Sequence, residues 1–136
     1  MFKIKFFFLI NNLKYTFAVG RRKSASARVR LFKGTGENLI NGKKVVEFAA
    51  QLARPFKITE TEGKYFFTAV VAGGGKEGQT EAIVHGIARA FVKLNPEKFR
   101  IVLKKNNLLT RDSRVRLRRM VGTGGKAKRK KQSPKR

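Results

Sequence analysis

Two stretches in the first half of the chain have the side-chain pattern of β-strands. Every second residue of 25–31 is apolar, whereas Arg28, Arg30 and Phe32 fall on the alternate positions. Because successive side chains of a strand point to opposite faces, this pattern predicts a strand with one apolar and one basic face. Residues 64–72 are rich in aromatic and β-branched side chains, which predicts a second, well-buried strand.

Between these strands the sequence predicts shorter elements. Residues 37–40 suit a short strand, and Asn41-Gly42 after them favours a tight turn. Residues 45–52 predict a short helix that stops before Pro55, because the residue preceding a proline disfavours helical geometry. A brief strand over 57–59 is expected next.

A period near 3.6 residues appears after the glycine run 73–75 and predicts a helix over 78–94. A second face of this helix is polar, because His85, Arg89 and Lys93 are spaced four residues apart. The predicted core stripe consists of Ile83, Ile87, Ala90, Phe91 and Leu94.

Asn95-Pro96 ends that helix and starts another, which continues through residues 99–105 to Asn106-Asn107. Strands and helices together predict a small α/β (α+β) sandwich, with a mostly antiparallel sheet covered by helices. No internal repeat is visible.

The charge of the chain is large and unevenly distributed. Of 136 residues, 33 are Lys or Arg and 8 are Asp or Glu, which gives a formal net charge of +25. Self-repulsion on this scale opposes folding, and a phosphate backbone would neutralise it. The last acidic residue is Asp112. We therefore expect an N-terminal extension (residues 1–14), a globular domain (15–112) and an extended basic tail (113–136).

Several classes of protein are excluded by what the chain lacks. It has no cysteine and one histidine, which excludes disulfides, thiolate metal sites and a His-rich metal site. The apolar run 6–10 is too short to cross a bilayer or to form a secretory signal. We expect no cofactor, no metal and no membrane or secretory role.

Catalytic chemistry is not expected either. The one histidine, His85, lies in the predicted helix with Arg89 one turn later, and the scattered carboxylates form no paired-acid motif, which favours a polar surface role over catalysis. Residues 73–76 lack the spacing of a phosphate loop, and 122–126 are followed by Ala127 instead of Ser or Thr. The glycine run 73–75 suits a strand-to-helix turn, an approach of backbone amides to phosphate, or both.

Nucleic-acid binding is the stronger interpretation. Arg21, Arg22 and Lys23 are expected in a loop before the first strand, whose basic face carries no acid between its arginines. The scarcity of aromatic residues among the cations favours phosphate contacts to folded RNA over base stacking. The candidate RNA-binding residues are Arg21, Arg22, Lys23, Arg28, Arg30, His85, Arg89, Lys93, Lys104, Lys105, Arg111, Arg114, Arg116, Arg118, Arg119, Lys126, Lys128, Arg129, Lys130 and Lys131.

An ordered set of motifs resembles the bacterial-type small-subunit ribosomal protein S-nine family. The matching segments run from residue 15 to the end of the chain. They are Gly20-Arg21-Arg22-Lys23-Ser24, Ala27-Arg28-Val29, Ile40-Asn41-Gly42, Gly73-Gly74-Gly75, Gly78-Gln79, His85-Gly86-Ile87-Ala88-Arg89-Ala90, Leu103-Lys104-Lys105, Leu109-Thr110-Arg111-Asp112 and Gln132-Ser133-Pro134-Lys135-Arg136.

The resemblance implies a fold similar to the second domain of ribosomal protein S-five. It implies a place in the head of the small ribosomal subunit, against the 3′ major domain of its rRNA and neighbouring head proteins. It also implies that the tail reaches P-site tRNA, which Ser133, Lys135 and Arg136 would contact. The location would be cytoplasmic, in a bacterial ribosome, with an organellar ribosome as the other possibility.

Two other functions are consistent with parts of this sequence. A free RNA-binding protein or RNA chaperone would use the same basic domain outside the ribosome. A small-molecule kinase would use a related fold with a glycine-rich turn, although the chain lacks a phosphate-loop Ser or Thr and a cluster of catalytic acids. The resemblance implies neither an enzyme nor a small-molecule substrate.

Overall fold

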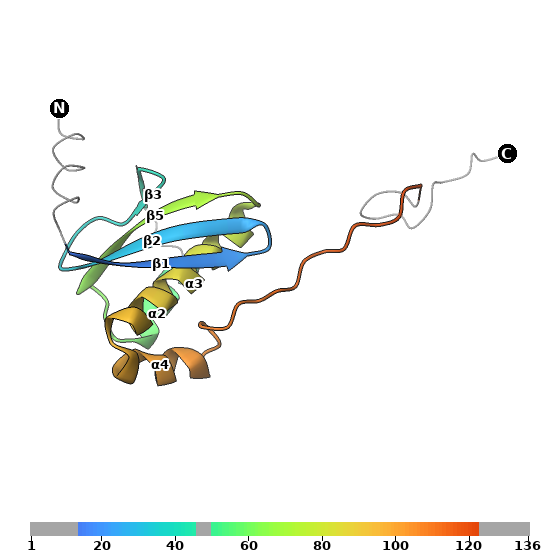
Figure 1. The fold of residues 1–136 in the computed structure, drawn as a ribbon. Coiled ribbons are helices and arrows are strands. Elements are labelled where there is room, and N and C mark those ends of the chain that lie inside the picture. The colour runs from blue at the N-terminus through green and yellow to red at the C-terminus, as the bar shows by residue number, and fades with distance from the viewer. Residues whose placement is uncertain (1–13, 46–49, 123–136) are drawn as a thin grey trace, which may run out of the picture.

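A five-stranded sheet runs through the computed structural model, which describes residues 14–45 and 50–122. Three long strands are β1 (Tyr15–Arg22), β2 (Ala25–Lys33) and β5 (Tyr65–Ala72), and two short ones are β3 (Leu39–Ile40) and β4 (Lys43–Lys44). Their order is β1-β2-β5-β3-β4 (Figure 1). All neighbours are antiparallel except β3 and β5, so the mostly antiparallel sheet is confirmed.

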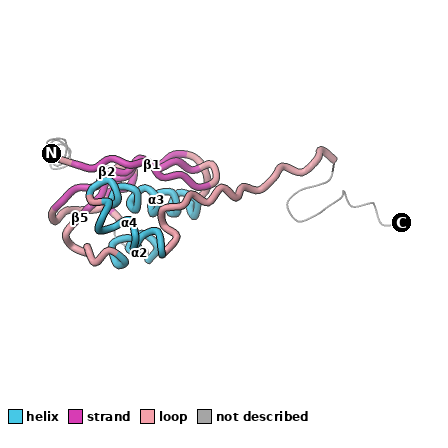
Figure 2. The backbone as a smooth tube through the Cα atoms, turned by 60° about the horizontal axis from the view of Figure 1, so that its bottom comes forward, coloured by secondary structure: helices cyan, strands magenta, loops and turns pink. Residues whose placement is uncertain are grey.

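Three helices cover one face of this sheet. They are α2 (Ala50–Ile58), α3 (Lys76–Leu94) and α4 (Pro96–Lys105). Figures 1 and 2 show all three on the same side, with α3 directly beneath the long strands. None of the helices in the described part of the chain covers the opposite face, and none is long and apolar enough to span a membrane. The fold is thus a two-layer α/β arrangement.

The core lies between the sheet and α3. Val29 and Leu31 of β2 and Ile87 and Phe91 of α3 are at most 1% exposed. Burying each of these side chains contributes about 1.5–3 kcal/mol. The predicted stripe of α3 is confirmed except for Leu94, the last residue of the helix, which is 38% exposed.

The approach of α3 to the sheet depends on two glycines. A Cβ on Gly20 of β1 would lie 1.9 Å from the carbonyl oxygen of Ala82 and 2.4 Å from the amide nitrogen of Gly86. A Cβ on Gly86 would lie 2.6 Å from Cγ2 of Val29. These distances are shorter than van der Waals contact, so the two backbones meet without intervening side chains. As a result, the polar side chains of α3 reach the backbone of β1.

The predicted strands 25–31, 37–40 and 64–72 and the helices over 78–94 and up to Lys105 are confirmed, with boundaries shifted by a few residues. The Asn41-Gly42 turn is also confirmed. It joins β3 to β4, and both residues have positive φ (50° and 77°).

The segment around Pro55 was predicted wrongly. α2 begins at Ala50 and continues through Pro55 to Ile58, so the expected strand over 57–59 is absent, and residues 46–49 lie outside the described part of the chain. Proline removes one helical hydrogen bond. Here the unpaired carbonyl belongs to Gln51, which is exposed and can bind water, while the ring of Pro55 is fully buried in the core.

The loop predicted for residues 20–24 is also wrong. Gly20, Arg21 and Arg22 are the last residues of β1, and only the next two residues form the turn to β2. Pairing with β2 over eight residues overrides the loop character of a glycine followed by three cations.

Phe32 lies on the basic face of β2 as predicted, yet it is 1% exposed. Its ring stacks on that of Phe66 with centroids 4.9 Å apart, and Leu39 packs beside them. This small cluster covers one end of the sheet face that the helices leave uncovered.

Candidate nucleic-acid interface

The predicted polar face of α3 is turned towards β1, the edge strand of the described sheet. The Lys93 Nζ atom donates to the Phe17 carbonyl at 3.0 Å, and the Arg89 Nη1 atom donates to the Val19 carbonyl at 2.5 Å. His85 accepts the backbone N–H of Arg21 at 3.3 Å through Nδ1. One row of α3 thus binds alternate residues of β1.

His85 also contacts the segment that follows α4. Its Nε2 atom lies 3.1 Å from the Leu109 carbonyl, which can only accept, so Nε2 carries the proton and Nδ1 is free to accept. Burial lowers the pKa of His85, and the positive charges of Arg89 and Arg111 lower it further, while the hydrogen bond from Nε2 to the Leu109 carbonyl acts in the opposite direction. The neutral imidazole is the form that satisfies both backbone contacts.

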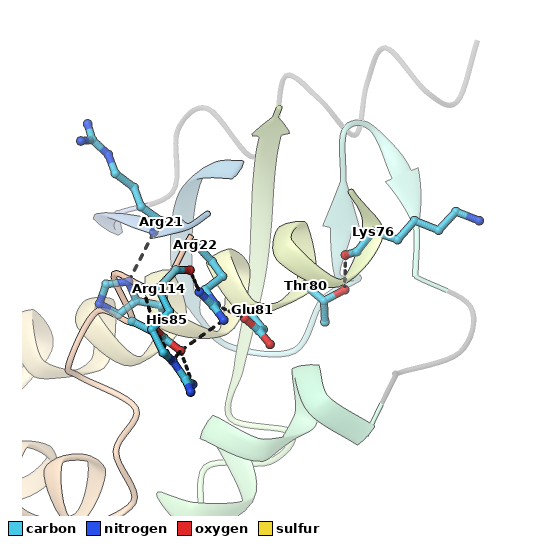
Figure 3. A network of polar contacts seen from close by, with 8 residues as sticks. Arg21, Arg22, Lys76, Thr80, Glu81, His85 and Arg114 are labelled. Carbon is cyan, nitrogen blue, oxygen red and sulfur yellow. Dashed lines mark hydrogen bonds and ion pairs between the residues drawn. The ribbon is translucent and has the colours of Figure 1, made fainter. Parts of the chain in front are cut away.

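Arg22 connects three parts of the chain (Figure 3). Its guanidinium pairs with Glu81 of α3, lies 3.2 Å from the Asp112 carboxylate and donates to the Arg114 carbonyl at 2.8 Å. Its side chain is 13% exposed. Arg114 itself folds back onto Asp112, with a side-chain distance of 2.7 Å. Hydrogen bonds from Arg114 hold the pKa of the Asp112 carboxyl well below its usual range, with a smaller contribution from the charge of Arg22.

A second group of cations points into solvent from the opposite face of the sheet. Arg28 and Arg30 of β2 are exposed, and the Arg21 side chain points away from the Arg22 contacts (Figure 3). The Arg30 guanidinium lies 5.1 Å from the centre of the Tyr15 ring, a cation–π contact. We call this surface the open face; its residues are Tyr15, Phe17, Arg21, Arg28, Arg30 and Val70.

Aromatic residues on the open face were missed at the level of sequence. Tyr15 is 46% exposed and Phe17 is 42% exposed. The small residues Ala18 and Gly20 alternate with them and face the helices, so the strand period was present in this segment. Its signal was hidden because glycine and alanine do not mark a buried face as larger side chains do.

The turn from β1 to β2 brings Lys23 next to the glycine run. Lys23 is exposed with a φ of 51°, and Gly73 and Gly74 have φ values of 75° and 67°. A Cβ on Gly73 would lie 2.5 Å from the Ser24 carbonyl oxygen. The glycine run therefore serves as the predicted strand-to-helix turn, packed against the β1–β2 turn.

The remaining predicted cations lie away from the open face. Lys104 and Lys105 end α4, and Arg111 and Arg114 flank Asp112. Arg116, Arg118 and Arg119 are exposed on a segment without helix or strand, which leaves the domain in Figures 1 and 2. The other predicted residues lie outside the described part of the chain: Lys126, Lys128, Arg129, Lys130, Lys131, Ser133, Lys135 and Arg136.

Residues 14–45 and 50–122 contain no group of three or more His, Cys, Asp or Glu side chains that could hold a metal ion. What the described residues do provide is a hydrogen-bonded sheet whose exposed guanidinium groups can bind phosphate in pairs of hydrogen bonds. A domain with one helix-covered face, one open cationic face and a basic extension has the features of a polyanion-binding protein.

Comparison with known proteins identifies the family. The profile of the family described as Ribosomal protein S9/S16 matches residues 20–136. Small ribosomal subunit protein uS9 of Maridesulfovibrio salexigens is 41% identical over 117 residues, covering 82% of this chain and 89% of that protein. The uS9 proteins of Anaeromyxobacter sp. and Anaeromyxobacter dehalogenans are 47% identical with the same coverage. The chain belongs to the ribosomal protein S9/S16 family.

Membership of this family confirms the resemblance inferred from the sequence motifs. It makes the protein a structural component of the ribosome and not an enzyme, which excludes the small-molecule kinase considered above.

Proposed function

We propose that the protein is a component of the small ribosomal subunit in the bacterial cytoplasm, where it binds rRNA of the 3′ major domain in the subunit head, next to other head proteins. The observation that carries this proposal is the open face. Arg21, Arg28 and Arg30 are directed into solvent from one rigid sheet, and no acid lies among them on the described strands. The names of the bacterial uS9 relatives support placement in the small subunit.

The open face suits a folded RNA. Arginines fixed on a sheet present a constant spacing to the phosphates of an RNA groove, and such contacts position a protein without reading sequence. The exposed rings of Tyr15 and Phe17 add a surface on which an unpaired base can stack. This second contact extends the expectation from sequence, which favoured phosphate contacts alone.

The proposed domain (residues 15–112) continues into a basic tail (113–136) that binds rRNA and then P-site tRNA. Lys135 and Arg136, with Ser133 nearby, would contact the tRNA backbone, so that every tRNA is held alike. If the tail engages about ten phosphates, the log–log dependence of affinity on salt should have a slope of roughly −7 to −9.

Charge reversal tests the rRNA contact. A triple variant with Arg21→Glu, Arg28→Glu and Arg30→Glu should fail to enter small subunits, as measured by its stoichiometry in subunits washed at high salt. Arg22 is left intact because its guanidinium is held by residues of the same chain. Arg54→Glu, Lys57→Glu and Arg100→Glu change the net charge equally on the helical side, and this control should assemble. Equal incorporation of both variants would contradict the proposal.

Truncation tests the tail. Subunits assembled with a chain lacking residues 132–136 should retain less tRNA in the P site than subunits with the full chain. The control carries Lys126→Gln and Lys128→Gln, which removes the same two charges nearer the domain. Unchanged retention after truncation would contradict the tRNA contact while leaving the rRNA contact untouched.

A further inference from the structure

The segment that joins α4 to the tail is fixed to the domain at successive points. Leu108 is 8% exposed, and its backbone N–H donates to the Leu103 carbonyl at 3.1 Å. The next carbonyl, of Leu109, is bound by His85 of α3. Asp112 and the carbonyl of Arg114 are bound by Arg22 of β1. The segment thus contacts first the core, then α3, and finally the end of β1.

Asp112, which takes part in the last of these contacts, also fixes the conformation of the backbone around it. Asp112 Oδ1 accepts the backbone N–H of Arg114 at 2.9 Å, which closes a turn over three residues. The same carboxylate accepts from the Arg114 side chain and pairs with Arg22. One carboxylate therefore fixes both the shape of the chain at this point and its position against the domain.

Arg22 is poorly placed to contact an external phosphate. Its side chain is 13% exposed and is already paired with Glu81, Asp112 and the Arg114 carbonyl. If the Arg22 guanidinium moved to an RNA phosphate, its ion pairs with both Glu81 and Asp112 would break. The two unpaired carboxylates would then lie near the negative charge of the RNA. Its charge is therefore used within the chain, although it belongs to the same sequence motif as the exposed Arg21.

Asp112 has a special place in the charge distribution. It is the last acid of the chain, and every ionisable side chain after it is a cation. Arg22 and Arg114 both pair with it, so removing its charge would leave these two cations facing one another. Their repulsion would push the start of the tail away from the domain.

We propose that Arg22, Asp112 and His85 form a clamp that fixes the point and direction in which the tail leaves the domain, and that they are positioning residues, not RNA-binding ones. The clamp itself is a property of the folded chain. Its benefit rests on the proposed function of the tail, because a tail that starts in a fixed direction searches less space for its RNA partner.

A distance measurement in the free, full-length protein tests the clamp. The chain has no native cysteine, so spin labels can be placed by Arg100→Cys on α4 and Leu117→Cys on the tail, where the native side chains are exposed. Pulsed electron paramagnetic resonance then gives the distribution of distances between them. We expect a narrow distribution that broadens with Asp112→Asn, with Arg22→Gln and with His85→Gln.

A matched control is available next to the clamp. Arg21→Gln removes the same charge one residue away, where the side chain points into solvent, and should leave the distribution unchanged. The double variant Arg22→Gln/Asp112→Asn should broaden it by less than the sum of the two single variants, because the two substitutions share the Arg22–Asp112 contact. Urea unfolding of each variant shows that the domain itself remains folded.

The outcome is separable from the proposed function. A wild-type distribution as broad as that of the variants, or variants as narrow as the wild type, overturns the clamp. P-site tRNA retention is then measured in subunits that contain the same variants. Broadening with reduced retention supports both proposals. Broadening with normal retention supports the clamp but contradicts its benefit to the tail, whose contact with tRNA is tested separately by the truncation of residues 132–136.

Discussion

Both faces of the sheet carry cations, but the contacts of these cations differ. On the helical side, Arg22, Arg89 and Lys93 contact carbonyls or carboxylates of the same chain. On the open face, Arg28 and Arg30 are exposed. A count of positive residues treats both groups as RNA-binding. Their contacts separate them, because each cation of the first group is hydrogen-bonded within the chain, whereas the side chains of Arg28 and Arg30 form no hydrogen bond or ion pair with the described residues.

The comparison indicates that part of the positive charge of this chain stabilises its own fold. Cations that bind their own backbone leave fewer for RNA, and the formal charge of the domain overstates its RNA-binding surface. Substitutions on the two faces should therefore affect different measurements, folding stability on one face and RNA affinity on the other.

The largest effect is expected where the helical side is held together. Gly20→Ala places a Cβ 1.9 Å from the Ala82 carbonyl oxygen, so β1 and α3 must separate. We expect a loss of about 3 kcal/mol in the free energy of unfolding, measured by urea denaturation. The control is Gly75→Ala, where no atom lies within 4 Å of the added Cβ and φ is −99°. A smaller loss at Gly20 than at Gly75 would contradict this packing.

A pair of matched substitutions tests the division directly. Arg89→Met removes the hydrogen bond to the Val19 carbonyl and should cost about 1 kcal/mol of unfolding free energy. Arg28→Met on the open face should change stability by less than about 0.5 kcal/mol. RNA affinity should respond in the opposite order, with the salt slope reduced by about 0.9 for Arg28→Met if Arg28 contacts one phosphate. If the same variant had the larger effect on both stability and RNA affinity, the distinction between the two faces would be contradicted.

Acid should weaken the helical side through His85. Its pKa is lowered in the folded protein, so the unfolded chain binds a proton first as pH falls. The stabilisation is complete above pH 6.5, the ordinary histidine value, and is lost as pH falls from there through the lowered pKa of the folded state. Urea denaturation across this pH range should show that the free energy of unfolding falls in the wild type and changes less in His85→Gln. An equal pH dependence in the two proteins would contradict this role of His85.

The smallest effect concerns the open face. Tyr15→Leu removes the aromatic partner of Arg30 while keeping an apolar side chain, and should cost about 0.5 kcal/mol in stability. RNA binding should fall if the ring also stacks on a base. The comparison variant is Tyr15→Phe, which retains the ring and should behave as the wild type in both assays.

The sequence predicted most elements because their signals were strong. β2 and α3 have clear periods of 2 and 3.6, and Asn41-Gly42 specifies its own turn. β1 was missed because Ala18 and Gly20 conceal its buried face, although the close approach of α3 needs such small residues. The prediction at Pro55 failed because burial of the ring outweighs a lost hydrogen bond.

The candidate site was harder to predict than the fold. Arg21 and Arg22 are neighbours of the same type, and their separate roles arise because adjacent strand residues point to opposite faces. The contacts between Arg22 and Asp112 join residues 90 positions apart, and those between Arg89 and Val19 join residues 70 apart. A sequence pattern that spans a few residues cannot predict contacts over such separations.

The row of α3 side chains along β1 has a consequence before any RNA is bound. An edge strand with free carbonyls and amides is a template on which another chain can add a strand, and this leads to aggregation. Lys93, Arg89 and His85 occupy alternate backbone groups of β1 and place positive charge along the edge. These contacts leave fewer backbone groups of β1 open to pairing with a second chain.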